Sequence, residues 1–220
     1  MKLVMVSNYS KNNKHLVDLT LFNHYEYCTN HNIDFLFTQS VYSPHNNLEE
    51  IENLWQRYDA VATVGTDILF TDMNKPLESF IGDSLITFQE ESFGTGFGNG
   101  DFIIWRKIQN QKEAEFFDFL KQVNKSRWSS QETLNVLRRD QKYVEFFTLL
   151  PPKSIQSVCP FQPKELYGNN FEKLPQNVKN ASWTPGDFSV HCFTPGHAQR
   201  PISKCEQVKI FLTKFAEQDK

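Results

Sequence analysis

The sequence has no long apolar run, no internal repeat and none of the short motifs that mark common hydrolases and nucleotide-binding loops. The apolar run LVMV near the N-terminus is too short for a signal peptide, and no run approaches the roughly 18 residues that span a bilayer. Walker, GxSxG and HExxH sequences are absent. We therefore expect no membrane anchor, and the sequence gives no basis for these hydrolase or P-loop classes.

The sequence also lacks a large net charge of either sign and closely spaced pairs of cysteines. The formal net charge is -3 with acids and bases mixed along the chain, so neither a nucleic-acid surface nor a polybasic membrane patch is expected. Cys28, Cys159, Cys192 and Cys205 form no CxxC pair. We expect free thiols and a reducing, cytoplasmic location.

The 220 residues present are enough for one well-buried α/β domain. Aromatic residues make up 14% of the chain, which suits a dense core and sugar-binding surfaces equally well. Apolar residues recur at helical spacing in some segments, and β-rich runs separate these segments. We expect helices over 15–30, 48–58, 111–123 and 203–216, with further helices beginning at Pro76 and at Ser129 or Ser130. We expect strands over 2–6, 33–37, 60–64, 84–88, 102–105, 143–150 and 188–193. The proline-rich segment 151–187 carries several aromatic residues, so we expect an ordered loop there.

The stretch YDAVATVGTDILFTDM, residues 58–73, is the most informative part of the chain. An apolar run of strand length, 60–64, ends in Gly65-Thr66-Asp67, and a second apolar run follows. Ligands of open α/β sheets bind beyond the carboxyl ends of the strands, so Asp67 would lie within reach of a ligand. The alternative is a turn residue that accepts backbone hydrogen bonds, and we favour that role for Asp72.

The segment DILFTDM, residues 67–73, resembles the region around the Asp-x-Asp motif of GT-A glycosyltransferases. The resemblance is greatest to the galactosyl- and xylosyltransferases that build the side branches of fungal mannan and plant xyloglucan. In that family, two acids hold a divalent metal ion on the diphosphate of a nucleotide sugar. Here Gly65 stands where the first acid belongs, and Asp67 matches the second. The resemblance implies a single-domain GT-A fold with a mainly parallel sheet and helices on both faces, and Mn²⁺ or Mg²⁺ bound by Asp67, with Thr66 beside the donor.

The segment VHCFTPGH near the C-terminus resembles the end of the family's catalytic domain, where a histidine on the last strand binds the metal. His191 matches that histidine best, and His197 is the competitor. Imidazole and carboxylate ligands can share Mn²⁺, although lone histidines are more often structural. The resemblance also implies donor contacts at Gly196 and His197.

Two basic residues follow this segment. A departing nucleoside diphosphate needs positive charge, so Arg200 and Lys204 are candidates to neutralise it. The alternative for each of them is ordinary exposed charge.

The first strand and its loop hold the nucleotide in GT-A enzymes. The resemblance therefore makes Val6, Ser7, Asn8 and Tyr9 candidates for contact with uridine, with Tyr9 stacking on the base. A plain turn in which Asn8 or Ser10 caps the next helix would explain the same residues.

The glycine-rich stretch QEESFGTGFGN, residues 89–99, fits no phosphate-loop pattern. It is better explained as a flexible loop whose backbone comes close to something bulky, such as a sugar. The next residues, NGDFIIWRK, resemble a family segment that lies under the donor sugar. Asn99, Gly100 and Asp101 are therefore candidate site residues.

The segment SSQETLNVL begins a helix, and its capping character is a sufficient structural explanation. It also resembles the family's Asp-Gln-x-x-Leu helix start, which faces the anomeric carbon. Gln131 matches the Gln, and Ser130 stands where the Asp would be. We expect Ser130, Gln131 and Glu132 to hold sugar hydroxyls, with Gln131, Glu132 and Asp101 as the catalytic residues.

The resemblance as a whole implies transfer of a hexose or deoxyhexose from a UDP-sugar to a saccharide or glycan hydroxyl, with retention of configuration. Residues 1–107 would form the nucleotide-binding half and residues 108–220 the acceptor half. A member without an anchor is similar to glycosyltransferase domains encoded by large algal DNA viruses. One rival is a nucleotide-sugar-binding protein without turnover, because Gly65 and Ser130 each replace an expected acid. The other is a sugar nucleotidyltransferase, against which the missing basic glycine-rich signature argues.

Overall fold

The structure is a computed structural model that describes residues 1–9, 14–39, 48–91, 96–124, 130–159, 176, 180–192 and 203–218. The strands are β1 (Leu3–Tyr9), β2 (Asp34–Gln39), β3 (Ala60–Val64), β4 (Ile68–Phe70), β5 (Ile86–Glu90), β6 (Gly98–Arg106), β7 (Phe147–Leu150), β8 (Ser157–Val158) and β9 (Ser189–His191). The helices are α1 (Lys14–Asn30), α2 (Leu48–Leu54), α3 (Gln111–Asn124), α4 (Ser130–Arg139) and α7 (Lys204–Gln218), with short 3-10 turns at Leu77–Phe80 and Val144–Phe146.

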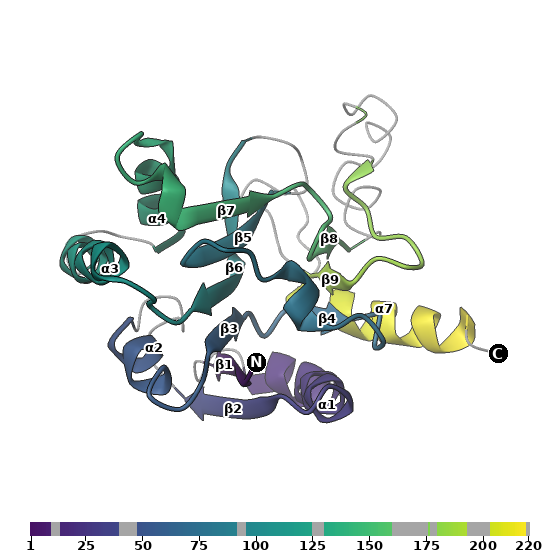
Figure 1. The fold of residues 1–220 in the computed structure, drawn as a ribbon. Helices are drawn as coiled ribbons and strands as arrows, with labels where there is room; N and C mark the ends of the chain where they lie inside the picture. Colours follow the sequence, from purple (N-terminus) through teal and green to yellow (C-terminus); the bar gives the residue numbers. More distant parts are fainter. Residues whose placement is uncertain are drawn as a thin grey trace.

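Two sheets organise the molecule. The larger is six-stranded in the order β2-β1-β3-β6-β5-β7, and β6 runs antiparallel to both of its neighbours while the other strands share one direction. The smaller is three-stranded in the order β4-β9-β8. Figure 1 shows the small sheet beside the large one, next to α7.

The two faces of the large sheet are covered by different helices (Figure 1). Side chains of a strand alternate between faces, so Val61 packs in the core with α2, α3 and α4, while Ala60 and Ala62 pack in the core with α1. A third core joins α7 to the small sheet, where Val208 and Phe211 are buried. The expected α/β fold, with a mainly parallel sheet and helices on both faces, is confirmed.

The segment predicted as a glycine-rich loop is partly strand, because β6 already begins at Gly98. A Cβ atom on Gly98 would lie 1.8 Å from the ring of Phe88, and one on Gly100 would lie 2.8 Å from Cβ of Gln131. The bulky neighbours of this backbone are therefore side chains of the same chain. The prediction of a flexible loop over 89–99 is wrong for residues 89–90, which lie in β5, and for residues 98–99, which lie in β6, while residues 92–95 lie outside the described part of the chain.

Other expectations are met with shifted bounds. Helix α2 ends at Leu54, four residues before the predicted end, and a 3-10 turn precedes β7. All four cysteines are free thiols, as expected. Within the described residues, none of the helices has the length and apolar character needed to cross a membrane.

The predicted ordered loop over 151–187 is only partly described, since residues 160–175 and 177–179 lie outside the described ranges. In its last part, Trp183 is buried, its ring lies 5.0 Å from that of Phe211, and its Nε1 donates a hydrogen bond to Thr71. This end of the loop packs on the small sheet and α7.

Candidate active site

Backbone pairing brings three distant segments together at the carboxyl end of β3. The backbone N–H of Gly65, directly after β3, donates a 2.7 Å hydrogen bond to the carbonyl of Asp101 on β6. Strands β4 and β9 pair with Ile68 opposite His191, and the N–H of Cys192 donates a 2.8 Å hydrogen bond to the carbonyl of Asp67. The register of two strand pairs therefore places Asp67, Asp101 and His191 side by side.

Four side chains meet there, and we call Asp67, Asp101, His191 and Lys204 the acid–base cluster. Nε2 of His191 lies 3.4 Å from Oδ2 of Asp67 and 3.4 Å from Oδ2 of Asp101. Nζ of Lys204, the first residue of α7, contacts the same Oδ2 atom of Asp67. The side chains of Asp67 and His191 are each 6% exposed, whereas those of Asp101 and Lys204 are 42% and 43% exposed. We call Asp67 and His191 the buried floor of the cluster, and Asp101 and Lys204 its solvent-facing rim.

The protonation of the cluster follows from its mutual contacts. Burial alone would raise the pKa of Asp67, but His191 and Lys204 outweigh burial and hold that pKa well below its usual range. Burial alone would lower the pKa of His191, but the carboxylates of Asp67 and Asp101 raise it. Burial opposes the charge of Lys204 as well, and Asp67 raises its pKa nonetheless. The cluster therefore keeps Asp67 negative and Lys204 positive, and it favours an imidazolium between the two acids.

The two segments predicted to face the sugar contact each other beside this cluster. The N–H of Gly100 donates a 3.0 Å hydrogen bond to Oε1 of Gln131, and Nε2 of Gln131 donates to Glu91. The side chain of Asn99 accepts a hydrogen bond from the N–H of Asp101. The predicted segments 99–101 and 130–132 therefore meet. Glu132 is exposed on the first turn of α4, and the side chain of Ser130 lies outside the described part.

The expected nucleotide contacts on β1 agree less well with the structure. Val6 packs in the core of the large sheet, and the fully buried Ser7 hydroxyl donates a 3.0 Å hydrogen bond to the carbonyl of Val64. These side chains are buried and Ser7 is hydrogen-bonded inside the protein, so the contact of Val6 and Ser7 with uridine stays a prediction that only their backbone could meet in this arrangement. Asn8 and Tyr9 lie in β1, but their side chains are not among those described.

Thr66 directly precedes Asp67 in the turn between β3 and β4. It is buried, and its carbonyl accepts a hydrogen bond from the hydroxyl of Thr20 on α1. This contact fixes the turn that carries Asp67 against α1.

Three predicted residues, Gly196, His197 and Arg200, lie outside the described residues. The structure therefore places His191 at the cluster and gives no position for its competitor His197. The sequence predicted that Asp67 and His191 come together, and the 3.4 Å between them agrees with that prediction, whereas the contacts of Asp101 and Lys204 with this pair were not predicted. Strand register would have revealed them, and a single sequence does not give register.

Comparison with known proteins gives the fold a precedent. No family model matches the sequence, and no curated protein matches it. A glycosyltransferase involved in glycosylation of the major capsid of PBCV-1 superposes with a TM-score of 0.62 at 12% identity, covering 97% of this chain and 100% of the other. The chain has the GT-A glycosyltransferase fold.

Two further glycosyltransferase structures share the GT-A fold. GlyE of Streptococcus pneumoniae matches with a TM-score of 0.59 at 12% identity over 100% of this chain, which spans 64% of GlyE. The galactosyltransferase LgtC, in complex with donor and acceptor sugar analogues, matches with a TM-score of 0.50 at 13% identity over 97% of this chain and 95% of LgtC. At these identities the likeness shows the GT-A fold and nothing finer.

The metal ion expected at a GT-A site does not fit the side chains found here. Gly65 provides no carboxylate, and a Cβ atom on it would lie 2.8 Å from Oδ1 of Asp67. The ammonium of Lys204 contacts the other oxygen of that carboxylate. Among the residues that the structure describes, no group of three His, Cys, Asp or Glu side chains is arranged to hold a metal ion. The described side chains therefore do not support the predicted binding of Mn²⁺ or Mg²⁺ at Asp67.

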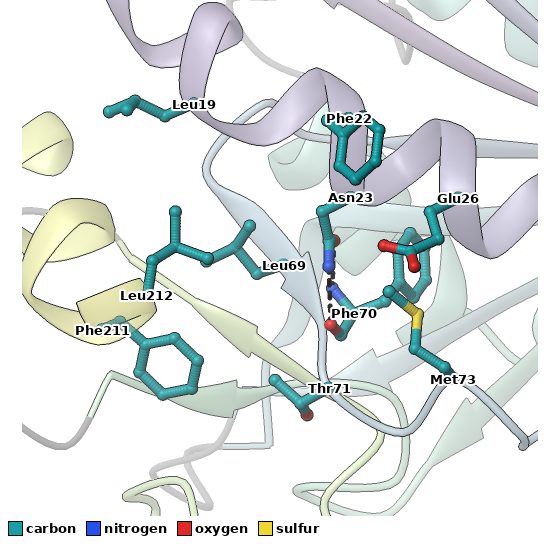
Figure 2. Close-up of a pocket in the computed structure, with 10 residues that line it drawn as sticks. All are labelled: Leu19, Phe22, Asn23, Glu26, Leu69, Phe70, Thr71, Met73, Phe211 and Leu212. Carbon is teal, nitrogen blue, oxygen red and sulfur yellow. Dashed lines mark hydrogen bonds between the residues drawn. The ribbon is translucent and has the colours of Figure 1, made fainter. Parts of the chain in front are cut away.

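A pocket of about 370 Å³ lies between α1, β4 and α7 (Figure 2), and none of the four cluster residues lines it. Its lining residues are Leu19, Phe22, Asn23, Glu26, Leu69, Phe70, Thr71, Met73, Phe211 and Leu212. The side chain of Asn23 donates to the carbonyl of Phe70 and accepts from its N–H, which satisfies the outer edge of β4. The lining is mostly apolar and its one charged group is an acid, so the pocket is unsuited to a diphosphate.

Proposed function

We propose that this protein is a glycosyltransferase that moves a hexose or deoxyhexose from a UDP-sugar to a hydroxyl of a saccharide or glycan, with retention of configuration. The acid–base cluster is the observation that carries the proposal. It combines a buried carboxylate, an imidazole and a half-exposed ammonium at the carboxyl end of β3, in a fold that glycosyltransferases share. Open α/β sheets bind ligands at this edge.

In the proposed reaction, the bond between the anomeric carbon and the diphosphate oxygen breaks, and its electron pair leaves with UDP. The acceptor oxygen forms the new bond to the same carbon, and its proton passes to the departing diphosphate. Lys204 stabilises the negative charge that develops on the leaving group, and preorganised charge of this kind contributes several kcal/mol. Asp67 positions the ammonium through its contact with Nζ, and His191 acts through Asp67, whose Oδ2 lies 3.4 Å from Nε2 of His191.

The donor sugar would lie over the place where β6 meets α4. Asp101 is 42% exposed at the rim of the cluster, and Gln131 is held by the backbone of Gly100. We propose that these two side chains contact the donor sugar hydroxyls and the acceptor. Glu132, on the same turn of α4, is a candidate for the acceptor side because it is exposed.

Several finer assignments belong to the same proposal. Residues 1–107 form its nucleotide-binding half and residues 108–220 its acceptor half. A viral source belongs to the proposal as well, and the structural neighbour involved in glycosylation of the major capsid of PBCV-1 motivates it. The four free thiols favour a reducing compartment such as a cytoplasm.

The test is incubation of the purified chain with a panel of UDP-sugars, with and without mono- and disaccharide acceptors, and measurement of UDP release. We expect one UDP-sugar to release UDP, and an acceptor to increase the rate. Release of pyrophosphate in place of UDP would identify a nucleotidyltransferase. No release from any sugar nucleotide, with no binding, would contradict the proposal.

Binding without turnover is a second candidate, because Gly65 and Ser130 stand where the resembled family has acids. Calorimetry on the same panel separates the two candidates. A UDP-sugar that binds but releases no UDP with any acceptor would favour the second.

A further inference from the structure

The acid–base cluster already holds a cation where a GT-A enzyme would place its metal. Nζ of Lys204 contacts Oδ2 of Asp67, the one strongly buried carboxylate of the cluster. A divalent ion bound at this oxygen would have to displace the ammonium, because two cations at one oxygen repel each other. Asp67 is the one acid in the turn Gly65-Thr66-Asp67, because residue 65, where the resembled family has its first acid, is glycine.

The space near Gly65 also disfavours a second carboxylate. A Cβ atom there would lie 2.8 Å from Oδ1 of Asp67 and 3.4 Å from the carbonyl oxygen of Asp101. A side chain at this position would therefore push the Asp67 carboxylate from its present place. The contact between the Asp67 carboxylate and the Lys204 ammonium therefore depends on a glycine at position 65.

Lys204 is placed to serve a ligand as well as Asp67. Its side chain is 43% exposed while that of Asp67 is 6% exposed, so the ammonium stands between a buried carboxylate and solvent. It is the first residue of α7, whose start is fixed by Ser203, which accepts a hydrogen bond from the N–H of Glu206. The contact with Asp67 thus holds the ammonium, and the Lys204 side chain stays partly exposed at the rim of the cluster.

We infer that the Lys204 ammonium, in place of a divalent metal ion, supplies the positive charge that this site presents to the donor diphosphate, so that donor binding needs no metal. The inference rests on the proposed function, because it concerns the diphosphate of the nucleotide sugar. Asp67 acts as the buried counter-charge that fixes the ammonium, and Nε2 of His191 lies 3.4 Å from the same Asp67 oxygen. A lysine is suited to this because it binds phosphate as a compact point charge.

A purely structural role for Lys204 makes a different prediction. If Lys204 only neutralises Asp67, its replacement would lower stability and affect uridine and UDP equally. If it binds the diphosphate, its replacement would weaken UDP and leave uridine, which carries no phosphate, unchanged.

The experiment is calorimetric titration of the full chain with UDP and with uridine, in excess EDTA and again with Mn²⁺. We expect the native protein to bind UDP in EDTA, with Mn²⁺ changing the affinity by less than about threefold. Lys204→Met should weaken UDP binding about 10- to 100-fold in EDTA, the range of one charge-assisted hydrogen bond, and leave uridine binding unchanged. Lys204→Arg should recover most of the loss because it restores the charge.

Lys209→Met is the matched control, because Lys209 is an exposed lysine on the same helix, and its UDP affinity should equal that of the native protein. UDP binding that disappears in EDTA and returns with Mn²⁺ would overturn the inference while leaving the proposed function intact. Equal UDP affinity of Lys204→Met and the native protein would also overturn it. Failure of every nucleotide and sugar nucleotide to bind would overturn the proposed function itself, and the inference with it.

Discussion

Replacing Asp67 by asparagine is the most informative perturbation of this molecule, because one atom of that side chain contacts two basic groups. Oδ2 of Asp67 contacts Nζ of Lys204 and lies 3.4 Å from Nε2 of His191. Asparagine keeps the shape and removes the charge. We therefore expect the Lys204 ammonium to lose its fixed position and His191 to keep only Asp101 as an acidic neighbour.

The magnitude follows from burial. Breaking a fully buried pair costs about 3–5 kcal/mol, but the side chain of Lys204 is 43% exposed and can move into water. We expect Asp67→Asn to lower the free energy of unfolding by about 1–3 kcal/mol. The catalytic loss should be larger, about 100-fold or more in UDP release, because the charge on the leaving group is no longer stabilised in a fixed position.

The assays are urea unfolding and UDP release, each compared with Asp72→Asn. Asp72 lies in the same segment, and its Oδ1 accepts a hydrogen bond from the N–H of Asn74, so it has the turn role favoured from the sequence. We expect Asp72→Asn to lower stability by under about 1 kcal/mol and to keep full activity. Native activity in a well-folded Asp67→Asn protein would refute the reasoning.

Three further predictions concern pH, packing and metal specificity. Burial lowers the pKa of His24 from 6.5 to about 4 in the folded protein. As the pH decreases below 6.5, the unfolded chain binds a proton at His24 before the folded protein does, so the free energy of unfolding decreases, by about 2 kcal/mol at pH 5. Urea unfolding at pH 7 and pH 5 should show this fall reduced in His24→Gln, and an equal fall in both proteins would contradict it. Gly98→Ala should cost about 1–3 kcal/mol in thermal unfolding because its Cβ would lie 1.8 Å from the Phe88 ring, and an unchanged melting temperature would show that this strand can shift freely. In the double variant Gly65→Asp with Lys204→Met, loss of the ammonium releases the Asp67 carboxylate to move away from the new side chain, so this variant should bind UDP in a Mn²⁺-dependent manner in calorimetry. Indifference to Mn²⁺ would count against Lys204 as the metal's substitute.

Much of the fold could be predicted from local patterns. The run from Ala60 to Val64 and the turn after it are encoded by neighbouring residues, and the structure has a strand with these bounds. Local glycine content was misleading at Gly98 and Gly100, because glycine disfavours strands on its own. There the packing of Phe88 and Gln131 against the backbone overrides that preference.

Of the candidate site, the meeting of Asp67 with His191 could be predicted, through the resemblance to GT-A enzymes, but the contacts of Lys204 and Asp101 could not. Asp67 and Lys204 are 137 positions apart, and their contact depends on how α7 docks beside β4 and β9. The pairing of β3 with β6 brings Asp101 to His191, and no local pattern specifies that register. Likewise, the burial of Ser7 follows from its place between two strands of the sheet, which its polar neighbours in the sequence do not reveal.

A crystal structure of the full chain with UDP, grown in the presence of EDTA, tests the central claim most directly. The account predicts the diphosphate at the carboxyl end of β3, with a phosphate oxygen within hydrogen-bond distance of Nζ of Lys204 and Asp67 on the opposite side of the ammonium. UDP bound elsewhere, for example in the apolar pocket beside Leu69 and Phe211, would contradict it.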